Sequence, residues 1–204
     1  MKPMHIRPAR VEDAPALAHV LIDTGRATYP GQIPNEVLFM QSLEDAYAES
    51  ERNWRRSLEE IAAGDRGPAQ IFVAEDETGR VVGLAMGGPP KQAVLPQSGE
   101  IYVLYVRTGQ QGLGLGRALL TAVSTHLAQA GLSALQIGCL ATNARARRFY
   151  EHLGGRVVTE RTFDQDGATL LEVVYGWDAI GDIIAAGSAQ KGHDVHAETL
   201  RRLV

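Results

Sequence analysis

Residues 100–116, EIYVLYVRTGQQGLGLG, join the most apolar run of the chain to its densest group of glycines. Glu100–Val106 is typical of a strand buried on both faces of a sheet, and a helix opens directly after the glycines. A helix N-terminus carries unpaired N–H groups and the positive end of the helix dipole. Glycines there let the backbone approach an anion closely. The sequence therefore predicts a phosphate-binding loop that contains Gly109, Gly112, Gly114 and Gly116.

The flanking residues restrict which phosphate ligand this loop suits. A P-loop needs Gly-Lys-Ser/Thr, whereas Gly116 is followed by Arg117 and Ala118. A dinucleotide fingerprint needs a third small residue, and the two possible frames put Arg117 or Leu119 there, which argues against an NAD-dependent oxidoreductase. The remaining alternative is that the glycines serve only turns and packing.

Hydrophobic periodicity on either side of this stretch predicts a mixed α/β sheet with helices on both faces. We expect helices at 12–26, from Ser42 to about 63, from the 112–131 region and at 143–153, and strands at 6–9, 69–75, 81–86, 100–106, 134–140, 157–163 and 169–175. Residues 87–99 are rich in glycine and proline, which predicts a loop. Residues 1–177 form one expected domain, and 178–204 an appendage of uncertain order in which 196–204 is a short helix candidate.

Composition restricts the partners and the compartment. The formal net charge of −4 gives no indication of nucleic-acid or anionic-membrane binding. The single cysteine, Cys139, cannot form an internal disulfide, and neither it nor the six histidines show metal-ligand spacing. We therefore expect a cytoplasmic protein without a metal. The tail and the final strand are compatible with a homodimer.

Two motifs carry a family resemblance. Gln111-Gly112-Leu113-Gly114-Leu115-Gly116 resembles the Q/R-x-x-G-x-G/A signature of the GNAT superfamily of N-acetyltransferases. Residues 143–155, NARARRFYEHLGG, resemble the second motif of that superfamily, with an aromatic-Tyr pair followed by Leu-Gly. The resemblance implies a GNAT-like, mostly antiparallel sheet of about seven strands.

The resemblance also implies acetyl-CoA as cosubstrate and assigns the residues that contact it. The pantetheine arm would pair with the main chain of Leu104, Tyr105 and Val106, and the pyrophosphate would lie against residues 111–117, which are Gln111, Gly112, Leu113, Gly114, Leu115, Gly116 and Arg117. Arg117 is either a charged contact to the cofactor or an exposed side chain in the first turn. Asn143 is expected to be a helix N-cap. The resemblance implies that this N-terminal end of the helix faces the cofactor. Arg145, Arg147 and Arg148 could reach the ribose phosphate of CoA, but most of them are interpreted as a solvated helix face.

By the same resemblance, Tyr150 donates a proton to the departing CoA thiolate, whereas its spacing alone would suit a core tyrosine. A phenol with a pKa near ~10 is protonated at neutral pH, as a general acid must be. Glu100 is the candidate base that removes a proton from the incoming amine, or else a strand-end charge. Ribosomal-protein acetyltransferases of this family keep a glutamate where Gly138 stands here. Cys139 suits a buried small residue better than an acyl-carrying nucleophile.

The resulting hypothesis is an N-acetyltransferase that moves an acetyl group directly from acetyl-CoA to a primary amine. The acceptor would be a small molecule or a peptide, bound among residues such as Tyr29, Pro30, Tyr102 and Phe163, with Trp54 interpreted as core. The alternative is an acyl-CoA-binding or regulatory module without turnover, which needs the glycine loop but neither Tyr150 nor Glu100.

Overall fold

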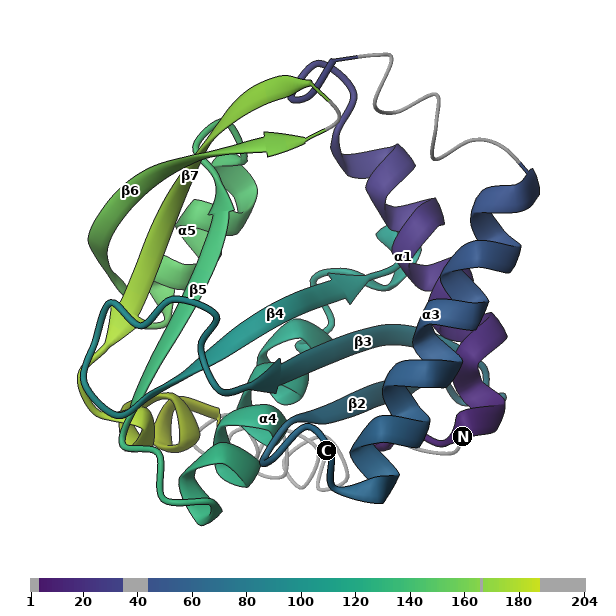
Figure 1. Cartoon of the computed structure of the whole chain (residues 1–204), viewed down its shortest axis with the longest axis horizontal. Coiled ribbons are helices and arrows are strands. Elements are labelled where there is room, and N and C mark those ends of the chain that lie inside the picture. The colour runs from purple at the N-terminus through teal and green to yellow at the C-terminus, as the bar shows by residue number, and fades with distance from the viewer. Residues whose placement is uncertain (1–3, 35–43, 166, 188–204) are drawn as a thin grey trace, which may run out of the picture.

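The computed structural model describes residues 4–34, 44–165 and 167–187 and contains one seven-stranded sheet (Figure 1). The strand order is β1-β2-β3-β4-β5-β7-β6, and only the β4–β5 contact is parallel. The strands are β1 (His5–Pro8), β2 (Gln70–Glu75), β3 (Val81–Gly88), β4 (Ser98–Val106), β5 (Ala134–Leu140), β6 (Arg156–Gln165) and β7 (Ala168–Trp177). The expected mixed, mostly antiparallel sheet is confirmed.

Helices cover both faces of this sheet, as the sequence predicts. On one face lie α1 (Ala14–Thr28), which follows the short helix η1 (Val11–Asp13), and α3 (Glu44–Ala63), whose Trp54 is buried in the core beneath them. On the other lie α4 (Leu115–Gln129) and α5 (Ala144–His152). The leucines and valines of α4, which are spaced three or four residues apart except for the adjacent Leu119 and Leu120, are all buried there. The sheet thus separates two apolar cores.

Most predicted elements lie within a few residues of their expected bounds. The strand predicted at 134–140 is β5 itself, and the helix predicted at 143–153 is α5 with Asn143 as its N-cap. The loop predicted at 87–99 is shorter, because β3 continues to Gly88 and β4 already begins at Ser98. The predicted helix start at Ser42 and the candidate helix at 196–204 lie outside the described residues.

The two central strands part midway along their length. Among the described residues, β4 pairs with β5 from Ser98–Ala134 to Ile101–Ile137, and both strands continue beyond that last pair. The expectation that residues 100–106 are buried on both faces is therefore wrong for 102–105, which are only partly buried. The fully buried central strand is β3, every residue of which is buried. The half-exposed part of β4 forms one wall of an opening in the sheet.

Residues 180–187, which follow β7, are helical and pack against the main core. Ile180 and Ile183 are 5% and 2% exposed. The amide of Ile180 donates to the carbonyl of Ser133, at the start of β5. This part of the expected appendage thus contacts the domain, while the division at residue 177 stays a prediction. None of the described helices combines the length and apolarity that a bilayer-spanning helix requires.

Replacing Ile183 by alanine tests that contact. We expect Ile183→Ala to lower the free energy of unfolding by about 3 kcal/mol, because a buried isoleucine loses its contacts and leaves a cavity. Leu171→Ala, at a side chain that is 45% exposed, should cost less than about 1 kcal/mol. Urea denaturation of the full chain followed by circular dichroism measures both changes. Equal losses would mean that residues 180–187 do not stabilise the domain.

Candidate active site

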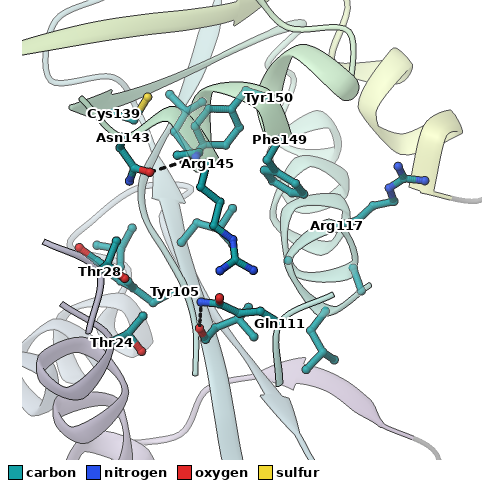
Figure 2. A pocket seen from close by; sticks show the side chains of 18 of the residues that line it. Thr24, Thr28, Tyr105, Gln111, Arg117, Cys139, Asn143, Arg145, Phe149 and Tyr150 are labelled. Atoms are coloured by element: carbon teal, nitrogen blue, oxygen red, sulfur yellow. Dashed lines mark hydrogen bonds between the residues drawn. The ribbon is translucent and has the colours of Figure 1, made fainter. Parts of the chain in front are cut away.

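A cavity of about 1640 Å³ opens where β4 and β5 part. Its walls include the end of α1, the diverging halves of β4 and β5, the loop before α4, the first half of α4 and one side of α5 along its length (Figure 2). Of the acceptor candidates, Tyr29 and Tyr102 line it and Pro30 and Phe163 do not. Twelve of the thirteen residues proposed for catalysis and cofactor binding line it: Leu104, Tyr105, Val106, Gln111, Gly112, Leu113, Gly114, Leu115, Gly116, Arg117, Asn143 and Tyr150. The exception is Glu100.

The glycine loop brings the start of α4 to the cavity wall. Gly112 and Gly114 have φ angles of +83° and +80°, a left-handed conformation that side chains other than glycine adopt with strain. Gly114 is the N-cap of α4, and the first residues of that helix line the cavity. The unpaired N–H groups of its first turn therefore lie at this wall. This geometry suits a phosphate group.

Polar side chains surround the same wall. Gln111 Nε2 donates to the carbonyl oxygen of Val106 at 2.7 Å, which joins the loop to the end of β4. Arg145 extends from α5 over the middle of the cavity, towards Gln111, whereas Arg117 extends away from the middle (Figure 2). Arg145 is exposed, as a solvated face requires, and its place over the cavity also agrees with the alternative that it reaches a cofactor phosphate. Arg145 therefore adds positive charge beside the glycine loop, where a phosphate would bind.

The N-terminus of α5 faces the same cavity. Asn143 Oδ1 accepts a hydrogen bond from the amide of Ala146 at 3.1 Å, so the N-cap interpretation is confirmed. Arg147 is directed away from the cavity, where its Nε donates to the hydroxyl of Tyr175 at 3.2 Å. Arg147 also donates to the carbonyl of Ala141 and is partly buried, whereas Arg145 and Arg148 are exposed, as the interpretation of most of these arginines as a solvated face predicts.

Tyr150 lies at the inner end of the cavity with only 5% of its surface exposed. Its ring packs against Phe149, Tyr175 and Trp177, so the side chain belongs to the core and to the cavity wall at once. Burial, together with the nearby Cys139 and Tyr29, raises the pKa of Tyr150 above its ordinary value. The phenol is therefore neutral at physiological pH and able to donate a proton.

Two further tyrosines and the cysteine line the cavity near Tyr150. The hydroxyl groups of Tyr29, just after α1, and Tyr105, on β4, are 2.7 Å apart. Burial raises the pKa of both phenols. Burial also raises the pKa of the Cys139 thiol to about 11. Since the thiolate is the nucleophilic form of cysteine, this environment does not suit an acyl-carrying Cys139.

Glu100 lies on β4 before the strands part and is 6% exposed. Its Oε2 accepts a hydrogen bond from the amide of Lys91 at 2.7 Å, and its Oε1 lies 3.5 Å from an Nη of Arg161. Glu100 is not among the described residues that line the cavity. Its role as the base stays a prediction. No group of three or more His, Cys, Asp and Glu side chains suited to a metal ion occurs within the described residues.

Comparisons with known proteins agree with this geometry. Residues 37–155 match the Acetyltransferase (GNAT) family. The chain is 34% identical over 173 residues to the uncharacterized N-acetyltransferase YuaI of Bacillus subtilis, a match that covers 84% of this chain and 91% of that protein. The glycine loop, the parted strands and these matches define an acetyltransferase. The chain belongs to the GNAT family.

More distant relatives share part of the chain or its fold. Mycothiol acetyltransferase of Propionibacterium freudenreichii is 37% identical over 92 residues, which cover 45% of this chain and 29% of that protein. The structure of yncA, a putative acetyltransferase from Salmonella typhimurium with its cofactor acetyl-CoA, superposes with a TM-score of 0.64 at 22% identity. That superposition covers 86% of this chain and 94% of yncA, and it shows the shared fold.

The reactivity of Cys139 tests the environment of the inner cavity. A thiol with a pKa of about 11 is roughly a hundredfold less ionised at pH 8 than one with the ordinary pKa of about 8.5. We therefore expect the rate of alkylation by iodoacetamide to be at least a hundredfold lower in the native protein than in the urea-unfolded chain. Because the chain has one cysteine, mass spectrometry reports Cys139 alone. Similar rates in both states would show an ionised thiol and reopen its role as a nucleophile.

Proposed function

We propose that this protein transfers the acetyl group of acetyl-CoA directly to a primary amine while both substrates are bound. The parting of β4 and β5, with a helix N-terminus at one end of the opening and Tyr150 at the other, carries this proposal. A substrate with a pyrophosphate, an extended arm and a reactive end fits these features in that order. The relatives named N-acetyltransferases support the same reaction class.

The chain's own groups account for binding. The N–H groups at the start of α4 and the guanidinium of Arg145 hold the phosphates. Main-chain groups of Leu104–Val106, beyond the last pair with β5, bind the arm like an added strand. This places the thioester between the diverging strands, close to Tyr150. A main-chain N–H of β4 can stabilise the carbonyl oxygen during attack.

Tyr150 supplies the proton that the leaving sulfur needs. Its burial raises the pKa of the phenol, which by itself would weaken a general acid. The same surroundings raise the pKa of the Cys139 thiol to about 11. They should raise the pKa of the CoA thiol in the same way, so the departing CoA thiolate is a stronger base as well. Burial therefore leaves proton transfer from the phenol to the CoA thiolate feasible.

Release of free CoA tests this function. Propylamine, 1,4-diaminobutane and glycinamide serve as a panel of primary amines, and a thiol reagent detects CoA. We expect release only when acetyl-CoA and an amine are both present. If acetyl-CoA binds tightly in calorimetry but no amine is acetylated, the chain is an acyl-CoA-binding module and the proposal is wrong. Release without an amine would indicate a thioesterase instead.

Tyr150→Phe tests the acid separately. We expect kcat to fall about a hundredfold, within the range of general acid catalysis, while the Kd for acetyl-CoA changes less than threefold. Tyr175→Phe is the matched control, because Tyr175 is also buried but its hydroxyl donates to Glu151 at 2.6 Å. If both variants keep the wild-type kcat across pH 6–10, Tyr150 is not the proton donor.

A further inference from the structure

A charged row crosses the sheet on the face opposite α4 and consists of Glu100 on β4, Glu172 on β7 and Arg161 on β6. Arg161 Nε donates to Glu172 Oε2 at 2.5 Å, and an Nη of the same guanidinium lies 3.5 Å from Glu100 Oε1. The loop between β3 and β4 passes in front of β5 (Figure 1), and its Gln92 accepts a hydrogen bond from Arg161. Two carboxylates share one guanidinium, so the row carries a net negative charge.

Gly138 creates the space that this row occupies. A Cβ atom at position 138 would lie 2.0 Å from Glu172 Oε1 and 2.3 Å from its Cδ. The carboxylate of Glu172 therefore fills the volume that any other side chain at position 138 would need. Glu172 Oε1 is the oxygen nearest to that volume, while Oε2 binds Arg161.

This position is the point at which the two central strands part. The last β4–β5 pair is Ile101–Ile137, and Gly138 is the next residue of β5. Gly138 lines the cavity, as does Tyr102, its counterpart on β4. Glu172 is not itself among the described residues that line the cavity, but its carboxylate packs against Gly138, which is. The influence of its charge on the Cys139 thiol, whose pKa it helps to raise, agrees with this placement.

Neither carboxylate lines the cavity among the described residues, but Glu172 packs against the cavity-lining Gly138 and is the more exposed of the two. The Glu172 side chain is 19% exposed and that of Glu100 only 8%. The amide of Lys91 already binds Glu100 at 2.7 Å. Arg161 contacts both carboxylates, and its charge-assisted hydrogen bond from Nε to Glu172 Oε2 restrains the Glu172 carboxylate.

We propose that Glu172 binds the ammonium group of the acceptor at the apex of the opening and takes a proton from it. Arg161 is a positioning residue that holds the carboxylate over Gly138. This inference rests on the proposed acetyl transfer and names the base and the acceptor class for it. Because the row is negative overall, the acceptor is a primary amine without a carboxylate beside the ammonium, such as an amide or a polyamine, and free α-amino acids are excluded.

The reaction balances with these groups. The ammonium gives one proton to a Glu172 oxygen, which frees the nitrogen lone pair to form a C–N bond with the acetyl carbon. The C–S bond breaks, its electron pair stays on sulfur, and sulfur takes a proton from Tyr150. The nitrogen then loses a second proton to water, and Glu172 returns its own to water. One of these two protons restores Tyr150, and the other is the single proton released per turnover.

Glu172→Gln keeps the shape of the side chain and removes its charge. With the panel amine that the wild type acetylates fastest, we expect kcat/KM for the amine to fall about a hundredfold or more, while the Kd for acetyl-CoA stays within twofold. Glu160→Gln, an exposed site on β6, removes the same charge from the same hairpin and should leave kcat/KM within twofold of wild type. Glycine should be acetylated at least tenfold more slowly than glycinamide.

Gly138→Ala provides a second variant that leaves every charge in place. Its methyl group must displace the Glu172 carboxylate, which can move because it ends a flexible side chain. We expect at least a tenfold fall in kcat/KM for the amine. The double variant should be no slower than Glu172→Gln alone, because the two changes act on one interaction.

The outcomes separate this inference from the proposed function. A wild type that binds acetyl-CoA but acetylates no panel amine refutes the acetyl transfer itself. A wild type that turns over, with Glu172→Gln equally active, refutes only the role of Glu172. The same holds if Glu160→Gln loses as much activity as Glu172→Gln, or if glycine is acetylated as fast as glycinamide.

Discussion

The parting of β4 and β5 after the Ile101–Ile137 pair is the feature on which the site depends. Buried main-chain N–H and C=O groups need partners, and two neighbouring strands normally satisfy each other. Here the second half of β4 diverges from β5 and its main chain is left to line a cavity. A stable opening with main-chain groups along its wall can bind an extended substrate.

In the proposed reaction, the two substrates approach from opposite faces of the sheet. The glycine loop, α4 and α5 form the side that suits phosphates, and Tyr150 reaches the cavity from there. The row of Glu100, Arg161 and Glu172 occupies the opposite face of the sheet. Acetyl transfer requires an amine and a thioester to meet while their binding groups stay apart. An opening through the sheet at Gly138 meets that requirement, because this residue adds no side chain between the two faces.

The sequence predicts the local parts of this arrangement well. The strand at 134–140, the Asn143 cap and the glycine loop depend on neighbouring residues, so periodicity and capping preferences suffice for them. The parting of β4 and β5 could not be predicted, because an apolar strand gives no sign of where its neighbour diverges. Arg161 and Glu172 meet only through the register of β6 and β7, and no short motif contains them. Gly138 is visible in the sequence as a missing side chain on a central strand. The sequence does not show that the carboxylate of Glu172 fills that space.

A crystal structure of the full chain with acetyl-CoA tests the role of the opening. The account predicts the pyrophosphate against Gly112–Arg117, the pantetheine arm hydrogen-bonded to the main chain of Leu104–Val106, and the thioester sulfur within hydrogen-bonding reach of the Tyr150 hydroxyl. Electron density for the arm outside the space between β4 and β5, or a sulfur more than about 6 Å from that hydroxyl, well beyond the ~3 Å of a hydrogen bond, would contradict it.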